Sequence, residues 1–593
     1  MSHATHGFYL YQNSKRILDK DLMMEEKMKH IDKLFKYLFT LTLLSVLVIN
    51  SSQISNAQSE ILIRDTLYGQ VQGYEEEGAY IWKGIPYGGD TSGENRWKAP
   101  VDPEPWNEIL EANESGDIAI QASGDGVVGS EDALNLDIYR PANDAEGLPV
   151  MLFIHGGNNQ TGKAEEISGS SFVQNHDAII VSINYRLGAL GFNPLEALKT
   201  GTPEENSGNY TLLDILKSLD WLANNIENFG GDSNNITVAG FSAGGRDVMA
   251  MLSSPIFEGK FQKAISFSGG LTFADESASQ TVFAKAISTL VVEDGIKDSE
   301  EEAIEWLLTD DEEVRDYLMD LEADRLVSLM SNASIRMSVF PHLYTDGTVL
   351  PEDGIENTSY NNVPTILVSG TNEFSLFGRF DPYFAEAIAD DSINTDESIK
   401  AQYDFINKYG GELYGLANLD EPASKLSDDA NDSVYVMQIE YGTNQEVVPE
   451  EMSIFGAFHG VFVPLLDTNN QNYTALIGED AYSSNGAQAL SEGFQKYIYQ
   501  FMKNGDPNDG ELTEWTTYTS NEANLLVADA TQDDVIFEMS QREYDYDDVL
   551  AAIEEDDSIS DEEKEDLVLK VLNGRWFSYT LDKLYNNLSE FYQ

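Results

Sequence analysis

One serine stands in a context that suits a nucleophile. Ser242 lies in the segment GFSAGG (residues 240–245), between the apolar run 236–239 and a helix-like stretch at 246–252. A strand, a tight turn and a helix would place the hydroxyl at the carboxyl end of the strand. Glycines beside the serine avoid the collisions that a Cβ would cause in such a turn. The pattern predicts a serine nucleophile at position 242.

Histidines are scarce, so few side chains could act as the base for this serine. Of the seven histidines, three lie at positions 3, 6 and 30, and the others are His155, His176, His342 and His459. His459 lies far downstream in the small-residue loop 455–460, and a late histidine fits the chain order nucleophile, acid, base. We expect His459 to be the general base, with a solvent-exposed loop histidine as the alternative. His155 is expected to brace its own loop.

Glycines after another apolar run could provide hydrogen-bond donors. The run 150–154 is followed by His155 and the turn Gly156-Gly157-Asn158. We expect an oxyanion hole formed by the N–H groups of Gly157, Asn158 and Ala243, with Gly156 assisting the turn; an ordinary strand-ending turn is the alternative. Ester hydrolysis by serine requires a base, an acid that orients the base, and N–H donors that bind the oxyanion.

The elements that would position these residues alternate between strands and helices. Continuous apolar runs lack the alternation of a half-exposed strand, which indicates strands buried on both faces of a parallel sheet; the runs are 150–154, 178–183, 236–239, 263–267 and 365–369. Residues 210–227 carry leucines at helical spacing. Residues 61–87 suggest a meander at a sheet edge. Near the end of the chain, Ser560 and Glu563 form a capping box that opens a helix ending near 573–574. The fold class predicted is α/β, a doubly wound, mostly parallel sheet with helices on both faces.

The domain organisation is expected to be simple. Residues 1–57 resemble a targeting segment, because lysines precede the apolar run 37–49 and small residues at 55–57 suit cleavage after Ala57. An uncleaved anchor is the alternative. Residues 58–593 then form a single domain, and the acidic, helical stretch 276–335 is either an excursion over the active site or a peripheral helix pair. The expected location is secreted or periplasmic, without a stable membrane anchor.

The composition restricts the partners. Without residues 1–57 the chain holds 28 basic and 98 acidic residues, a formal charge of −70, which repels nucleic acid and anionic lipid. No acidic run has the spacing of a calcium loop, and the absence of cysteine excludes disulfides and thiolate chemistry. We expect no nucleic-acid partner, no metal and no cofactor.

Several further motifs, in this order, resemble the type-B carboxylesterase and cholinesterase group of α/β-hydrolases. They include KGIPY (83–87), EDALNLDIYRP (131–141), HGG (155–157), NYRLGALGF (184–192), NFGGD (228–232), GFSAGG, GTNE (370–373), GAFHG (456–460) and GDPN (505–508). The resemblance implies an α/β-hydrolase fold and a serine hydrolase of small-molecule carboxylic esters, with Ser242, Glu373 and His459 as the triad. It also implies two buried ion pairs, Arg96 with Glu131 and Arg186 with Asp214.

The acid is the least direct of these assignments. Counted strictly from Gly370, the family pattern would place the acid at Ser375, which cannot carry a charge. Assigning the acid to Glu373 therefore requires a two-residue deletion after Asn372 relative to the family. Glu373 follows the predicted strand 365–369, at the sheet edge where functional groups gather. Asp346 and Asp381 remain alternatives.

Other positions depart from the family. A loop-closing disulfide is replaced by Ala119 and Ala133, and the intervening loop is too short for the aromatic that holds choline, so a general carboxylesterase is favoured. Two glutamates of one buried network are replaced by Phe241 and Phe462, which predicts an apolar pocket wall. Two other functions remain open: a catalytically silent binding or adhesion module, and a hydrolase of amides or lactones.

Overall fold

The computed structural model describes residues 19–20, 22–37, 39–40, 61–124, 126–329, 333–354, 361–428 and 433–584. The chain divides into two units, Met1–Ile63 and Arg64–Gln593. In the first unit, residues 22–37 are helical and exposed. The predicted cleavage site at Ala57 lies outside the described residues. Within the described ranges, no helix combines the length and the apolar character needed to cross a membrane.

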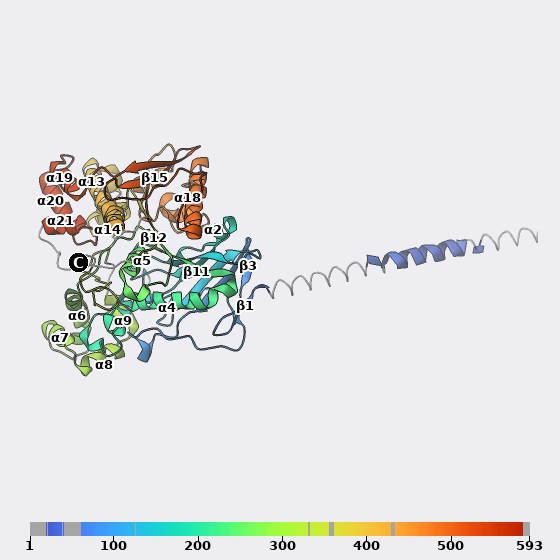
Figure 1. The fold of residues 1–593 in the computed structure, drawn as a ribbon, viewed down its shortest axis with the longest axis horizontal. Helices are drawn as coiled ribbons and strands as arrows, with labels where there is room; N and C mark the ends of the chain where they lie inside the picture. Colours follow the sequence, from blue (N-terminus) through green and yellow to red (C-terminus); the bar gives the residue numbers. More distant parts are fainter. Residues whose placement is uncertain are drawn as a thin grey trace, which may run out of the picture. The chain divides into compact units, whose positions relative to one another are not determined.

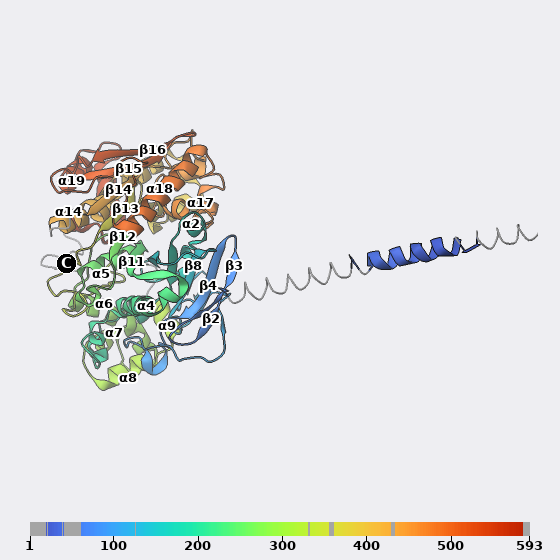
Figure 2. The same ribbon diagram turned by 45° about the vertical axis from the view of Figure 1, so that its right-hand side comes forward.

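The second unit is built on one large sheet (Figures 1 and 2). Its eleven strands follow the order β16-β15-β14-β13-β12-β11-β9-β10-β8-β4-β3. Parallel pairing runs without interruption from β10 to β15. The strands of this parallel block are β9 (Leu148–Ile154), β10 (Ile179–Ile183), β11 (Gly231–Phe241), β12 (Lys263–Phe267), β13 (Thr365–Gly370), β14 (Val434–Ile439) and β15 (Asn524–Ala530).

Each of the five predicted apolar runs is a strand of this parallel block, so the predicted strands are confirmed. Every residue of β9, β10, β12 and β13 is buried, which explains why their sequences are apolar without alternation. No predicted run corresponds to β14, where Tyr435 and Gln438 interrupt the aliphatic residues, or to β15.

Antiparallel strands close both edges of the sheet. At one edge β3 (Tyr74–Glu76), β4 (Ala79–Pro86) and β8 (Asn135–Pro141) pair antiparallel, and at the other β16 (Val535–Gln541) pairs with β15. Of the predicted meander at 61–87, only β3 and β4 form this edge, and the strands before them belong to a separate small sheet. Short strands form two small sheets: β1 (Ile63–Asp65), β2 (Gln70–Gln72) and β5 (Leu110–Glu111) in one, and β6 (Gln121–Ser123) and β7 (Gly126–Val128) in the other.

Helices cover both faces of the sheet. On one face, Met151, Ala239 and Ile265 belong to a cluster with side chains of α2 (Ser170–Asn175) and α18 (Asn485–Asn504). Alternate residues point to the other face, where the side chains of Val150 and of Ile226, just after α4 (Tyr210–Asn225), both lie beside Gly231. The expected α/β class with helices on both faces is confirmed.

The remaining helices connect the strands and extend the C-terminal part. The stretch 276–335 contains α6 (Glu276–Glu293), α7 (Glu300–Leu307), α8 (Glu312–Asp320) and α9 (Ala323–Leu329) (Figure 1). The predicted capping box at Ser560 and Glu563 opens α20 (Asp561–Leu567), which continues through a wide turn to Asn573. Other helices are α3 (Gly188–Gly191), α5 (Ala243–Ser253), α10 (Ser375–Arg379), α11 (Ala385–Ala389), α12 (Ser392–Thr395), α13 (Glu397–Gly415), α14 (Glu421–Asp428), α15 (Glu450–Phe455), α16 (Val463–Leu466), α17 (Thr474–Ile477), α19 (Tyr546–Glu555) and α21 (Tyr579–Leu584).

Candidate active site

Ser242 occupies the sharp turn between β11 and α5. Its φ of 56° and ψ of −117° are rare for a residue with a side chain, and its N–H donates to the Phe267 carbonyl at 2.8 Å. A Cβ on Gly240 would lie 2.1 Å from the Gly244 carbonyl oxygen, and one on Gly244 would lie 2.2 Å from that of Ile154. The close approach of the strands and the helix therefore requires both glycines.

His459 lies in the loop between α15 and α16 and lines the same cavity as Ser242. Its Nδ1 is 2.5 Å from Oε2 of Glu373. Because a carboxylate only accepts hydrogen bonds, this geometry assigns the proton of the neutral ring to Nδ1 and leaves Nε2 as the basic nitrogen. Nε2 is shielded from solvent and has no hydrogen-bond partner among the described residues. It is free to accept a proton from a hydroxyl group.

Glu373 lies just beyond the carboxyl end of β13 and is fully buried. Its Oε1 accepts hydrogen bonds from Ser268 Oγ at 2.6 Å, Ser369 Oγ at 3.0 Å and the Gly370 N–H at 2.7 Å. These donors hold one oxygen, so the other faces His459. The structure thus brings together the three residues of the expected triad.

The two alternative acids are engaged elsewhere. Asp346 accepts hydrogen bonds from backbone N–H groups of residues 348–350. Asp381 forms ion pairs with Arg336 at 2.9 Å and with Arg575 at 2.6 Å. Each therefore fixes a local loop or an arginine pair, and neither contacts His459.

The other histidines are withdrawn from acid–base chemistry at this site. His155 is buried, stacks on Tyr185 at 4.3 Å between ring centroids, and has a pKa lowered to about 4 by burial. Burial also lowers the pKa of His176 to about 4. His342 is fully buried, and desolvation and the neighbouring Arg246 hold its pKa well below the ordinary value. Its Nε2 accepts a hydrogen bond from Arg246 Nη1 at 2.9 Å.

The glycine turn after β9 approaches the nucleophile closely. A Cβ on Gly156 would lie 3.1 Å from Cβ of Ser242, and one on Gly157 would lie 2.1 Å from the Thr161 carbonyl oxygen. Gly157 and Asn158 have φ of 96° and 56°. This left-handed backbone turns the chain sharply beside Ser242.

The N–H groups near Ser242 differ in their availability. The N–H of Gly156 donates to Oε2 of Glu166 at 2.7 Å, so it cannot also face a reacting carbonyl. No hydrogen bond within the described part of the chain uses the N–H groups of Gly157, Asn158 or Ala243. Gly156 therefore contributes close packing to the expected oxyanion hole, and the other three residues can supply donors.

Aromatic rings surround the imidazole of His459. The ring centroids of Phe241, Phe377 and Tyr414 lie 4.8, 4.9 and 5.6 Å from that of His459. Phe462 was expected to line the pocket, but it is not among the lining residues. Its ring packs behind that of Phe241, with 5.0 Å between the ring centroids. Among the two expected pocket residues, Phe241 lines the cavity.

The cavity beside Ser242 has a volume of about 610 Å³. Part of its wall comes from Ile120 and Ala122, and part from Val327, Ser334 and Ile335 at the end of the stretch 276–335. The helices α6–α8 do not line it, so only the last part of the predicted excursion reaches the site. In the described ranges, no group of three or more His, Asp or Glu side chains could hold a metal ion.

Two buried ion pairs stabilise loops near the site. Arg96 forms two hydrogen bonds with Glu131, each 2.7 Å long, and donates to the Leu321 carbonyl just after α8 at 2.6 Å. Arg186 binds Asp214 through contacts of 2.8 and 2.7 Å. Both pairs implied by the resemblance are confirmed.

This geometry agrees with the sequence comparisons. A family model described as the carboxylesterase family matches residues 60–412. The chain belongs to the carboxylesterase family. Para-nitrobenzyl esterase from Bacillus subtilis (strain 168) is 28% identical over 494 residues, covering 78% of this chain and 94% of the relative. Juvenile hormone esterase from Tribolium castaneum is 40% identical over 215 residues, covering 34% of this chain and 36% of the relative.

Solved structures of carboxylesterases share the fold. A PNB esterase matches with a TM-score of 0.63 and 27% identity, covering 80% of this chain and 97% of the other. The carboxylesterase EST55 from Geobacillus stearothermophilus matches with a TM-score of 0.63 and 25% identity, covering 81% and 98%. The protein has the α/β-hydrolase fold and is a carboxylic ester hydrolase.

Some residues of the site were not found from the sequence. Ser268 directly follows β12, so its place at the carboxyl edge of the sheet was a usable signal. Phe377 and Tyr473 line the cavity, but nothing in their local sequence marks them. Glu166 was also missed, because a glutamate between two ordinary polar segments carries no signal of its own.

Proposed function

We propose that this carboxylesterase family member is a secreted serine esterase that forms an acyl-enzyme on Ser242. One observation carries the proposal: His459 Nδ1 is bound to Glu373, while Nε2 lacks a partner among the described residues and the histidine shares a cavity with Ser242. A histidine held in this way is oriented to act as a general base for a serine hydroxyl.

In the first half of the proposed reaction, Ser242 Oγ attacks the ester carbonyl carbon and its proton passes to His459 Nε2. The imidazolium that forms is stabilised by the Glu373 carboxylate, which stays ionised. The carbonyl oxygen becomes an oxyanion that accepts hydrogen bonds from the N–H groups of Gly157, Asn158 and Ala243. Collapse of this intermediate releases the alcohol, which takes the proton from Nε2.

In the second half, water replaces the alcohol. His459 Nε2 accepts a proton from the water as the oxygen attacks the acyl carbon, and the same donors bind the second oxyanion. Collapse returns the proton to Ser242 Oγ and releases the carboxylic acid. Loss of one donor of this kind typically costs about 3 to 4 kcal/mol of transition-state stabilisation.

The substrate range is tested with a panel of nitrophenyl esters of increasing acyl length, together with the matched anilides and simple lactones. We expect the wild type to hydrolyse the esters fastest and Ser242→Ala to lose this turnover. Hydrolysis of the amides or lactones at rates above those of the esters would contradict the proposed ester specificity. Unchanged ester turnover in Ser242→Ala would contradict the nucleophile.

Secretion is supported by the lysines and apolar run that precede Ala57. The test is N-terminal sequencing of the protein recovered from the medium or periplasm of cells that express the full chain. A mature N-terminus at Gln58 is the expected result. Full-length protein confined to the cell interior would contradict this part of the proposal.

A further inference from the structure

Glu166 connects the glycine turn to the substrate cavity. Its Oε2 accepts the Gly156 N–H at 2.7 Å, and its side chain lines the cavity that contains Ser242 and His459. Its own backbone is fixed from the other side, because Asn470 Nδ2 donates to the Glu166 carbonyl at 2.8 Å. Glu166 is therefore held by Asn470 at its backbone and binds Gly156, the residue before the proposed oxyanion donors, through its carboxyl.

The adjacent Glu165 has a different environment. Glu165 forms ion pairs of 3.0 Å with both Lys83 and Lys163. Although burial opposes it, the hydrogen bonds from Ser115 and these lysines lower the Glu165 pKa to about 2. Within the described residues, Glu166 forms no ion pair. Burial raises the Glu166 pKa to about 7, despite the hydrogen bond from Gly156.

Few titratable groups face the Glu166 carboxyl. Burial raises the pKa values of Tyr473, before α17, and Tyr185, after β10, and the charge of Glu166 raises both further. His459 lines the same cavity. Neither tyrosine ionises near neutral pH, so the carboxyl is the group on this side of the turn that can change its charge there.

We propose that Glu166 is a positioning residue of the glycine turn and that ester hydrolysis is fastest when its carboxyl is neutral. The inference rests on the proposed function, because it concerns the oxyanion donors. A neutral carboxyl still accepts the Gly156 N–H and holds the turn. An ionised carboxyl adds a negative charge to the lining of the cavity in which the transition state develops one, and the two charges repel.

The ionisation of Glu166 gives a characteristic pH dependence. Glu166 ionises around pH 7, and turnover falls as the pH rises through this range. The wild-type kcat should therefore decrease by about tenfold on the alkaline side, because a negative charge on the lining of the cavity weakens the stabilisation of the oxyanion.

Three variants separate charge from hydrogen bonding. Glu166→Gln keeps an acceptor for the Gly156 N–H and removes the charge, whereas Glu166→Leu removes both. Glu165→Gln is the matched control, since it changes the adjacent glutamate, which is held by lysines away from the cavity. We would measure kcat and KM for a nitrophenyl ester from pH 5 to 9, with Ser242→Ala in parallel and thermal melting as a control of folding.

We expect Glu166→Gln to lose the alkaline decrease and to exceed the wild-type kcat at pH 8.5, while Glu165→Gln keeps the wild-type profile. Glu166→Leu should hold kcat about tenfold below the wild-type maximum, without an alkaline decrease and with little change in KM, because the unpaired Gly156 N–H disturbs the turn. An alkaline decrease that persists in Glu166→Gln, or a wild-type profile without one, would overturn the inference. Activity that survives in Ser242→Ala would instead refute the proposed function.

Discussion

At the scale of single residues, Glu373 illustrates how a buried carboxylate is prepared for one task. Three donors occupy Oε1, and Oε2 faces His459 at 2.5 Å. A buried carboxylate is costly unless its oxygens are paired, and here the serines and the backbone supply that pairing. The remaining oxygen can then fix the tautomer of the histidine.

Replacing Glu373 by glutamine tests this arrangement. Glutamine keeps the size of the side chain, but it cannot stabilise the imidazolium and presents an amide where His459 needs an acceptor. We expect kcat to fall by about 10³- to 10⁴-fold with the melting temperature nearly unchanged. Near-normal turnover in Glu373→Gln, combined with loss of turnover in Asp346→Asn or Asp381→Asn, would show that another acid serves His459.

Phe241 tests the apolar character of the site. Its ring packs between His459 at 4.8 Å and Phe462 at 5.0 Å. Phe241→Glu would place a carboxyl in this aromatic surrounding with Phe462 still present, so we expect a loss of stability of about 2 kcal/mol or more and reduced turnover. The control is Phe241→Leu, which keeps the surface apolar and should retain more stability and activity. A Phe241→Glu variant that is fully active and equally stable would refute this account.

Sequence reasoning was most informative for residues with a steric signature. Ser242 could be assigned because the turn that holds it requires glycine at positions 240 and 244. A Cβ at either position would lie closer than 2.5 Å to a backbone oxygen. Glu373 needed both a resemblance and an assumed deletion, since a glutamate leaves no steric trace. Glu166 could not be found, because its role depends on a hydrogen bond to a turn ten residues earlier.

At the scale of elements, the site gathers the carboxyl ends of neighbouring parallel strands. Ser242 follows β11, the glycine turn follows β9, Ser268 follows β12 and Glu373 follows β13. Strands that are buried on both faces are recognisable from sequence, and so their ends locate the site. The side-chain contacts between loops cannot be recognised from sequence, because they depend on how distant segments pack. The positions of Val327 and Ile335 on the cavity wall are an example.

The Arg96–Glu131 pair links two such segments. Arg96 also binds the carbonyl groups of Met319 and Leu321 near the end of α8. Arg96→Met would leave Glu131 and these carbonyls without their partner, and we expect the free energy of unfolding to fall by about 3 kcal/mol in a urea titration. The matched control is Arg315→Met, which breaks a more exposed pair with Glu312 and should change the free energy of unfolding much less. Equal costs for the two variants would contradict a structural role for the Arg96 pair.

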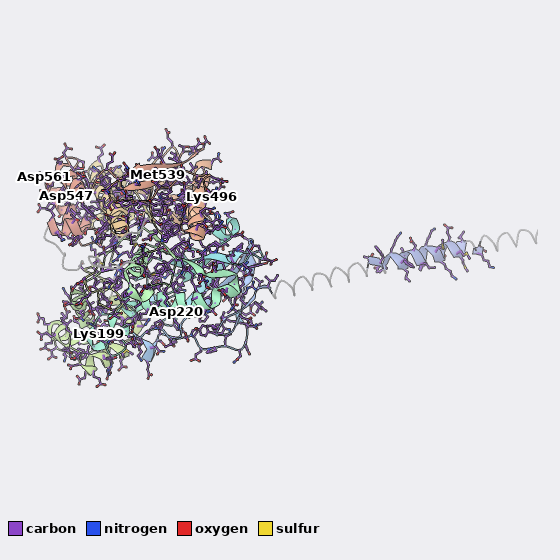
Figure 3. The ribbon with its side chains drawn as sticks, in the orientation of Figure 1. Lys199, Asp220, Lys496, Met539, Asp547 and Asp561 are labelled. Carbon is purple, nitrogen blue, oxygen red and sulfur yellow. The ribbon has the colours of Figure 1, made fainter. Side chains whose placement is uncertain are left out.

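At the scale of the whole molecule, acidic residues dominate the charge. The full chain has 103 acidic and 35 basic residues. Many lie on the surface, as Asp547 and Asp561 do at the C-terminal helices (Figure 3). Such a charge resists compaction through self-repulsion, and salt screens it, since the Debye length falls from about 8 Å at physiological ionic strength to about 3 Å at 1 M.

The melting temperature should therefore rise between low salt and molar NaCl. The comparison should use NaCl rather than sulfate, because sulfate also strengthens apolar burial. A melting temperature that stays flat or falls over this range would show that the acidic groups are spaced widely enough for their repulsion to be unimportant.

Covalent labelling of the nucleophile tests the assignment of Ser242 most directly. A fluorophosphonate probe reacts with an activated serine, and peptide mapping identifies the modified residue. We expect a single labelled serine, Ser242, with labelling lost in Ser242→Ala and strongly slowed in His459→Ala, because base and nucleophile act as one unit. Labelling at another serine, or labelling that persists in Ser242→Ala, would contradict it.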